Sequence, residues 1–462
     1  MLGNIAKAEI DKQSQTLIDL AHKMWDKPET AYNEVKACEW TAEVLKANGF
    51  DVEVGHAGLP TAIKASWGSG HPVIGFLGEY DALPGMSQKI CTHKEPIVPG
   101  GAGQGCGHNL LGVACVGGVL GMKAEMEEKK LPGTIIYFGC PGEEVLTGKA
   151  FMARNGAFRE LDVAFAWHGS NGNNLTMGSM TGLNSAIFHF KGRTAHAGGD
   201  PQNGRSALDA AELMSVGANY LREHVTSDVR IHYVYKEAGT APNIVPDRAS
   251  VWYYVRAMSR EAIEDTYDRL VKVAKGAAMM TETELEIEFL GGCYNTQPNR
   301  VLTDVAHEAM HEVEIPQWTE EELKFAEELN KQSPQYDKFK ASGALDNGPL
   351  ATDIPEIKTV YGYGSSDVGD VMHICPCIMV RNGTYNIAAP GHSWQITACA
   401  GMSIGHKGML QGSKVLAVSG LKMIENPELV EKAKAEFNET MHGRTYKCPI
   451  PMEVPVPQPQ KD

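Results

Sequence analysis

Two adjacent glutamates, Glu143 and Glu144, come shortly after an apolar run, GTIIYFGC at 133–140. The run predicts a buried strand that ends in a turn. Two carboxylates this close repel each other, and their removal from water costs further free energy unless a positive group is nearby. A solvated turn is the ordinary interpretation of such a pair. The alternative is a cation held at the end of the strand, with further ligands from elsewhere in the chain.

A thiol and three imidazoles are placed where they could join this pair. Cys106 and His108 lie two residues apart in GQGCGHNLLG, ahead of a predicted helix. A two-residue offset on extended backbone turns both side chains to the same side, so both could reach one ion. His168 ends the apolar run VAFAWH, and His392 follows a Pro-Gly turn in APGHSWQ. Each motif taken alone is more typical of a structural residue than of a metal ligand.

The shared position of these residues leads to the chemical prediction. In an open α/β sheet the carboxyl ends of the parallel strands lie at one edge, where ligands bind. Thiolate, imidazole and carboxylate groups gathered at that edge suit Zn²⁺ or a similar borderline divalent ion. Five such ligands exceed the four of a closed structural zinc site. They suit two ions with open positions for water, which is a catalytic arrangement.

The bulk properties exclude several other classes of function. The chain has 462 residues, of which 43% are hydrophobic and 21% charged, as in an ordinary soluble globular protein. A formal charge of −15 argues against nucleic acid or an anionic membrane surface as the partner. An anionic substrate would then need a local positive patch. No apolar signal core or run of 18 apolar residues occurs, and ten cysteines in a chain this long are no disulfide framework. We therefore expect a cytoplasmic protein with free or metal-bound thiols.

The chain alternates apolar strand patterns with helical patterns, which predicts an α/β fold around a mostly parallel sheet. The first stretch, 1–182, contains strand candidates at 72–78, 133–140 and 163–168. A glycine-rich helix that starts near Leu110 separates the first two of these. The alternation resumes after residue 297, so we expect 1–182 and 298–462 to form one domain.

The stretch 183–297 has an order of its own. A strand pattern, NSAIFHFKG, precedes a helix whose small apolar residues fall on one face, and two more strands, a second helix and the strand ELEIEFLG follow. This β-α-β-β-α-β order is the split, ferredoxin-like α+β unit. Since such a unit can close on itself, we expect a domain inserted into the first one.

Seven short motifs occur in this order: GEYDALPG, GCGHN, PGEE, WHGS, GRTAHAG, PGHSWQ and SIGHKGM. Together they resemble the aminoacylase and carboxypeptidase family of dinuclear metallopeptidases. Within it they are most similar to the amidohydrolase branch, which includes the hippurate and auxin-conjugate hydrolases. The resemblance runs nearly end to end. It implies a mostly parallel-sheet catalytic domain whose inserted domain is a lid that carries the dimer contact.

The resemblance also implies roles for the residues singled out above. Two divalent ions, zinc or manganese, would be held by five ligands: Cys106, His108, Glu144, His168 and His392. The thiolate of Cys106 would bridge the ions. Glu143 would be the general base that takes a proton from the attacking water and passes it to the leaving amine. On this interpretation a metal neutralises Glu144 while Glu143 stays free.

Three departures or additions concern residues near the ligands. Asp81 in GEYDALPG matches a family aspartate that orients a metal ligand. Two residues earlier the broader family has a ligating histidine, and here the residue is Glu79, which we therefore leave out of the ligand set. The branch also reads C-G-H-D-x-H, whereas this chain has Asn109 and Leu111 in the last two places.

The inserted domain contributes three further candidates. His196 in GRTAHAG matches a histidine that reaches the partner subunit's active site and stabilises the tetrahedral oxyanion. Asn243 and Arg256 match positions that hold the free carboxylate of the substrate, and Arg256 would supply the local positive charge that the acidic chain needs. The alternatives are a histidine on the lid surface and an ordinary salt-bridge arginine.

Three functions are therefore compared. The first is a metal-dependent amidohydrolase that releases an amino acid, often glutamate-like, from an aromatic acyl group. The second is a dipeptidase or a general N-acyl-amino-acid hydrolase with the same site. The third is a non-catalytic partner of a paralogous subunit, against which the retention of Glu143 and all five ligands argues. A small-molecule substrate is expected in each enzymatic case, with a homodimer or a heterodimer as the assembly.

Overall fold

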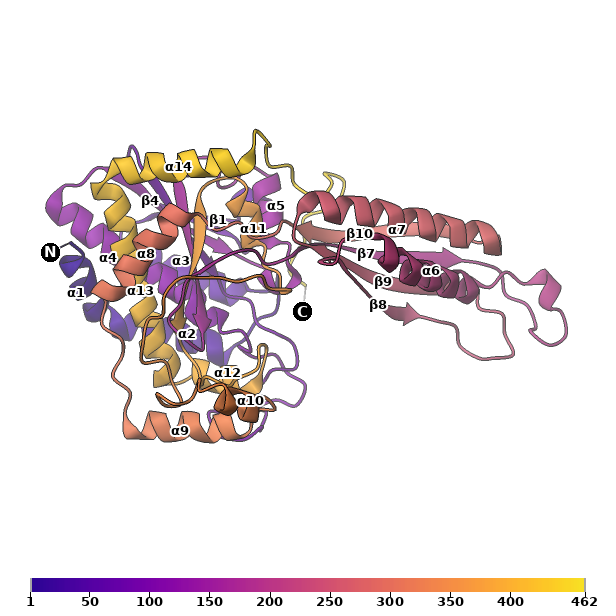
Figure 1. The fold of residues 1–462 in the computed structure, drawn as a ribbon, viewed down its shortest axis with the longest axis horizontal. Helices are drawn as coiled ribbons and strands as arrows, with labels where there is room; N and C mark the ends of the chain where they lie inside the picture. The colour runs from indigo at the N-terminus through magenta and orange to yellow at the C-terminus, as the bar shows by residue number, and fades with distance from the viewer. Residues whose placement is uncertain (1, 461–462) are drawn as a thin grey trace.

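The computed structural model describes residues 2–460 and shows two large β-sheets in two parts of the molecule (Figure 1). The first is six-stranded, with the order β1-β2-β4-β3-β5-β12. Its strands are β1 (Asp51–Val54), β2 (Ile63–Ser69), β3 (Val73–Glu79), β4 (Gly133–Cys140), β5 (Val163–Ser170) and β12 (Cys377–Gly383). The four strands from β4 to β12 are parallel, and β1 and β2 add an antiparallel edge.

Both faces of this sheet are buried, which explains its continuous apolar runs. In β3, Ile74 and Phe76 belong to the hydrophobic core on one face, whereas Val73 and Leu77 belong to the core on the other. The first face is covered by α1 (Asn4–Lys12), α2 (Ser14–Asp26), α3 (Val35–Ala47), α4 (His108–Lys129), α8 (Arg300–Glu312), α13 (Ser403–Glu425) and α14 (Pro427–Met441). The second is covered by α5 (Gly148–Arg154), α11 (Val368–Met372) and the segment 446–456.

The glycines of α4 let it approach its neighbours closely. A Cβ at Gly117 would lie 2.4 Å from the hydroxyl oxygen of Ser413 on α13, so a side chain there would force the two helices apart. Because α4 is buried along most of its length, this packing holds its first turn against the sheet edge. That first turn contains His108.

The second large sheet has four antiparallel strands in the order β10-β7-β9-β8. Its elements are β7 (Gly182–Lys191), α6 (Ala207–Leu221), β8 (Arg230–Glu237), β9 (Arg248–Ala257), α7 (Arg260–Thr281) and β10 (Glu284–Cys293). Both helices lie on one face, where a separate apolar core forms. This is the ferredoxin-like unit that the residue patterns predict, and it extends away from the larger part (Figure 1). The predicted fold class is confirmed.

The remaining elements are short or peripheral. The helices α9 (Glu320–Lys331), α10 (Tyr336–Ala341) and α12 (Trp394–Ala400) lie together at the lower end of Figure 1. The strands β6 (Thr176–Met177) and β11 (Lys358–Thr359) form a small parallel pair. Single 3₁₀ turns occur at η1 (His56–Gly58), η2 (Glu143–Val145), η3 (Pro201–Asn203) and η4 (Arg222–His224). Within residues 2–460, no helix has the length and apolar character that crossing a bilayer requires.

Candidate active site

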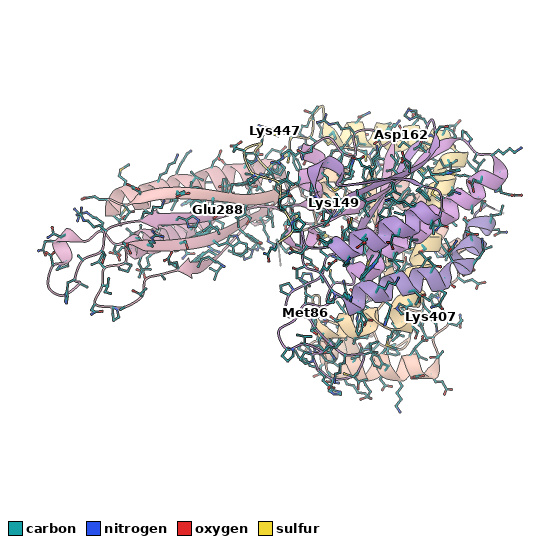
Figure 2. All side chains as sticks on the ribbon, turned by 180° about the vertical axis from the view of Figure 1, so that it is seen from behind. Met86, Lys149, Asp162, Glu288, Lys407 and Lys447 are labelled. Carbon is teal, nitrogen blue, oxygen red and sulfur yellow. The ribbon has the colours of Figure 1, made fainter. Side chains whose placement is uncertain are left out.

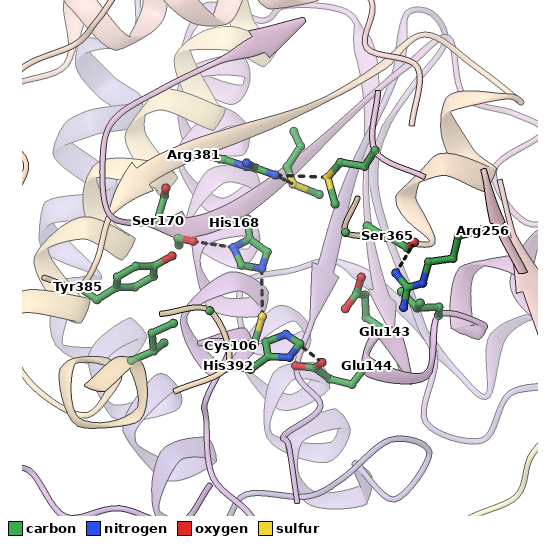
Figure 3. Close-up of a pocket in the computed structure, with 18 of the residues that line it drawn as sticks. Cys106, Glu143, Glu144, His168, Ser170, Arg256, Ser365, Arg381, Tyr385 and His392 are labelled. Carbon is green, nitrogen blue, oxygen red and sulfur yellow. Dashed lines mark hydrogen bonds and ion pairs between the residues drawn. The ribbon is translucent and has the colours of Figure 1, made fainter. Parts of the chain in front are cut away.

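The candidate ligands meet at the carboxyl edge of the parallel strands (Figure 3). β5 carries His168 close to its end, and η2 presents Glu144 just after β4. Cys106 immediately precedes α4, whereas His392 lies in the loop ahead of α12. Gly142 makes the turn after β4 possible, because its φ is +68° and a Cβ there would lie 2.7 Å from the ring of Tyr32.

Two groups of ligand atoms share one sulfur. The ligand atoms of Cys106, His108 and His168 all lie within 4.8 Å of one another, and so do those of Cys106, Glu144 and His392. The sulfur of Cys106 is 3.3 Å from Nε2 of His168, and Nε2 of His392 is 3.5 Å from Oε2 of Glu144. Cys106 therefore occupies a position from which it could bridge two ions.

Two buried polar atoms in these groups have no hydrogen-bond partner: Nε2 of His108 and Oε1 of Glu144. Leaving a buried polar group unsatisfied costs about 1–3 kcal/mol. The other nitrogen of His108, Nδ1, lies 2.9 Å from Oδ1 of Asp81, and Oδ2 of Asp81 accepts a hydrogen bond of 2.9 Å from the backbone N–H of Glu144. Asp81 thus orients both residues so that their unpartnered atoms face the shared space.

Burial disfavours the charged forms of the acidic ligands. It raises the pKa of the Cys106 thiol to about 12 and that of the Glu144 carboxyl to about 7. Burial also lowers the pKa of His168 to about 3, so its imidazole is neutral at pH 7. A neutral imidazole is a metal ligand, and a nearby cation favours the thiolate and carboxylate. The mixed sulfur, nitrogen and oxygen donors therefore fit a borderline divalent ion.

Metal affinity is expected to fall as the pH is lowered, by about tenfold per pH unit for each proton that binding displaces. Without a cation, the raised pKa values leave Cys106 and part of Glu144 protonated at neutral pH. Protons therefore compete with the metal, and raising the pH removes that competition. Calorimetric Zn²⁺ titrations in buffers of different ionisation enthalpy measure both the affinity and the number of protons released. An affinity that does not change with pH would contradict this ligand set.

Glu143 is 8% exposed and lies beside the ligand groups, with its Oε2 3.8 Å from Nε2 of His108. Burial, followed by the negative charges of Glu79 and Asp367, raises the pKa of this carboxyl well above its usual range. A carboxylate in such surroundings accepts a proton more readily than one in water. The adjacent glutamates thus differ in position: Glu144 belongs to a ligand group with Cys106, while Glu143 faces the cavity.

A buried ion network lies behind Glu143, and the motifs gave no indication of it. The ammonium of Lys149 is 2.5 Å from Oε1 of Glu79 and 2.6 Å from Oδ1 of Asp367, and all three side chains are buried. Figure 2 places Lys149 in the larger part of the molecule, close to the junction with the lid. Although Glu79, His108 and Glu143 form a third close group, Lys149 already compensates the charge of Glu79. This supports its omission from the ligand set.

A cavity of about 400 Å³ opens over the ligand groups, and the lid supplies part of its wall. Arg256 on β9 lines it and donates a hydrogen bond of 3.0 Å to the hydroxyl of Ser365. Arg381 on β12 also lines it, as does Tyr385. Arg381 was missed by the sequence reasoning. A cation within the otherwise apolar strand pattern CIMVRNG was the available signal.

His196 and Asn243 do not line this cavity. Both are exposed and lie next to each other, since the N–H of Ala197 donates to the carbonyl of Asn243 and His196 pairs with Ile244. Their loops, 192–206 and 238–247, lie at the end of the lid farthest from the catalytic sheet (Figure 1). Nδ1 of His196 accepts a hydrogen bond of 2.9 Å from Gly199 N–H, so the neutral ring carries its proton on Nε2.

Comparison with known proteins gives consistent results. Residues 179–279 match the peptidase dimerisation domain of the M20 family. The chain is 36% identical to one of the two subunits of the p-aminobenzoyl-glutamate hydrolase of Escherichia coli K12, over 98% of each chain. It is 29% identical to the Xaa-Arg dipeptidase of Mus musculus, over 95% of this chain and 92% of that protein.

Two solved structures have the same fold. An aminobenzoyl-glutamate utilization protein from Klebsiella pneumoniae aligns with a TM-score of 0.64 at 18% identity, over 89% of this chain and 97% of its own. A dinuclear metal-binding peptidase of the M20 family from Bacillus subtilis aligns with a TM-score of 0.59 at 16% identity, over 90% and 99%. The near-complete coverage at 36% identity, together with the fold, shows that this chain belongs to the M20 family of metallopeptidases and amidohydrolases.

Proposed function

We propose that the chain hydrolyses the amide bond of an N-acyl amino acid with an aromatic acyl group, such as p-aminobenzoyl-glutamate. The observation that carries this proposal is the sulfur of Cys106, which belongs to both ligand groups, with the buried carboxylate of Glu143 beside them. The 36% identity to the p-aminobenzoyl-glutamate hydrolase chain supports the choice of substrate. The five ligands and the dinuclear relative support two ions, zinc or manganese.

The chemistry divides between the ions and the chain. Two divalent ions held by the five ligands would polarise the amide carbonyl and lower the pKa of the attacking water. Glu143 accepts the proton of that water and delivers it to the leaving nitrogen as the C–N bond breaks, which gives a carboxylic acid and an amine. Asp81 keeps His108 and the turn at Glu144 oriented. Arg256 holds the carboxylate of the substrate from the lid side of the cavity.

A dipeptidase is the second candidate, because the chain is also 29% identical to the Xaa-Arg dipeptidase. A non-catalytic partner subunit is less well supported, since such a subunit has no physical need for a buried proton acceptor beside the ligands. The test combines metal analysis with a substrate panel on the chain purified alone. Turnover of p-aminobenzoyl-glutamate in preference to dipeptides and aliphatic acyl-amino acids supports the proposal. No turnover with added Zn²⁺ or Mn²⁺ would assign the chain to the partner role.

We propose further that 183–297 forms a lid that mediates dimer formation, with 1–182 and 298–462 as the catalytic domain. The match to the dimerisation domain supports this role. β8 is an edge strand of the lid sheet, and Tyr233 and Val234 on it are exposed, as a strand that pairs with another subunit would be. The partner is a second copy of the chain or a paralogous subunit. Ten unpaired thiols fit a cytoplasmic location.

In this assembly His196 acts in the active site of the partner subunit, where its Nε2–H donates a hydrogen bond to the oxyanion. We expect His196→Ala to lower kcat by about 10²–10³-fold with the metal content unchanged. Mixing this variant with Glu143→Gln under conditions of subunit exchange should restore activity, because one site of the mixed dimer regains both groups. Two dimeric variants that stay inactive after exchange would contradict a role across the interface.

A further inference from the structure

Arg381 is a cation in the cavity wall that has no acidic partner. Its guanidinium contacts the sulfur atoms of Met379 and Met180 at 3.5 Å and 3.7 Å, and no carboxylate within residues 2–460 forms an ion pair with it. A thioether sulfur is a weak acceptor, whereas a guanidinium carries five N–H donors. Most of the hydrogen-bonding capacity of Arg381 is therefore unused in the protein itself.

The backbone aims this side chain at the candidate metal centre. β12 runs parallel to β5, and Arg381 is the register partner of His168, so the two side chains leave the same face of the sheet. Figure 3 shows the guanidinium on the far side of His168 from Cys106, near Ser170 and Tyr385. The cavity wall here is formed by two methionines, a tyrosine and this one cation.

A cation in such a place is costly unless an anion joins it. Burial lowers the pKa of Arg381, which reflects the loss of water around the charge. Methionine in its place would pack well against Met180 and Met379 without that cost, so packing gives no reason for an arginine. An anion that enters the cavity would instead receive a two-pronged hydrogen bond in partly dehydrated surroundings.

Arg256 is the second arginine of the cavity, but it is held differently. It comes from the lid and bonds to Ser365, and its Nε is buried without a partner. In Figure 3 the two guanidinium groups lie on different sides of Glu143, one beyond His168 and the other towards the lid. A ligand that satisfies both arginines therefore carries two negative groups.

We propose that Arg381 binds a second carboxylate of the substrate, in addition to the one held by Arg256, so that the cavity selects dicarboxylic substrates. This inference rests on the function proposed above and specifies its substrate class. The second carboxylate belongs either to the side chain of an acidic amino acid or to the acyl group. The bond recognised is the same in both cases, a bidentate guanidinium–carboxylate pair.

The test compares p-aminobenzoyl-L-glutamate with p-aminobenzoyl-L-glutamine, which differ only in the side-chain charge. For the native chain we expect kcat/KM to favour the glutamate conjugate by about 100-fold, since a site built for a charged partner is left unpaired by the amide. Arg381→Met should lower kcat/KM for the glutamate conjugate by about 100-fold and change that for the glutamine conjugate by less than about threefold. Arg381→Lys should fall between, because it keeps the charge but loses the fork.

Two further arms make the result decisive. If the acyl group carries the second carboxylate, p-carboxybenzoyl-L-glutamine is the favoured substrate, and Arg381→Met removes that preference. Arg300→Met, which changes an exposed arginine paired with Asp304, is the matched control and should leave both rates unchanged. Equal effects of Arg381→Met on the charged and uncharged substrates would overturn the proposal.

Binding separates this inference from the function it rests on. L-Glutamate should bind to the native chain in a calorimeter more tightly than L-glutamine, and Arg381→Met should abolish the difference. The metal content of the variant is measured alongside, because Arg381 neighbours His168. Hydrolysis with an unchanged preference in Arg381→Met refutes the role of Arg381 alone. A chain that turns over no substrate refutes the proposed function, while the binding preference still decides on Arg381.

Discussion

Replacing Glu143 with glutamine is expected to lower kcat by about 10²–10⁴-fold while the metal content stays that of the native chain. The amide keeps the size of the side chain but cannot accept a proton. Glu143 lies 3.8 Å from Nε2 of His108 and is buried beside the ligand groups, so no other carboxylate that the cavity offers is free for this task. The measurement is kcat on p-aminobenzoyl-glutamate together with metal analysis of the same sample.

Glu144→Gln is the matched comparison for this prediction. The neighbouring residue belongs to the group with Cys106 and His392, so its replacement should reduce metal occupancy as well as rate. The two variants change the same atoms in adjacent residues and differ only in which carboxylate is lost. A native rate for Glu143→Gln, or the loss of its metal, would mean that the two glutamates have been assigned the wrong way round.

Replacing Cys106 with alanine is expected to remove both ions, whereas His168→Ala is expected to remove about one of about two. The reason is geometric: the sulfur of Cys106 belongs to both ligand groups, while His168 belongs to only one. Activity should be lost in both variants. Metal content after dialysis, measured per chain, distinguishes them, and thermal unfolding with and without added Zn²⁺ checks that each variant still folds.

Cys91→Ala is the control for the thiol. Cys91 is a half-buried cysteine outside the two groups that share Cys106. Its replacement should leave the metal content and rate unchanged. If Cys106→Ala retained one ion as firmly as His168→Ala does, the thiolate would belong to a single position, and the bridging role would be wrong.

The strands at the catalytic edge were predictable from local pattern. The runs at 72–78, 133–140 and 163–168 became β3, β4 and β5 within a few residues of their predicted bounds. Burial on both faces demands uninterrupted apolar sequence, so the signal is local. The lid was predictable for a related reason, because its alternating strands and amphipathic helices close on a core of their own.

The side chains around the ligands were less accessible to sequence reasoning. Lys149 lies in a helical segment, and its partners Glu79 and Asp367 are 70 and 218 residues away along the chain. Arg381 lies within an apolar strand, and only its register with His168 on β5 turns it into the cavity. Local pattern carries no information about which distant residues share a space, because that depends on how the strands pair and how the helices cover them.

By itself the sequence determined which elements form, which polar residues end the strands, and which family the motifs resemble, since these follow from residue type and spacing. Only the tertiary structure decided that one sulfur belongs to two ligand groups, that Lys149 compensates Glu79, and that Arg381 enters the cavity without a partner. The physical reason is that burial and pairing are properties of three-dimensional neighbours. The charge that a side chain meets there is set by residues far from it in the chain.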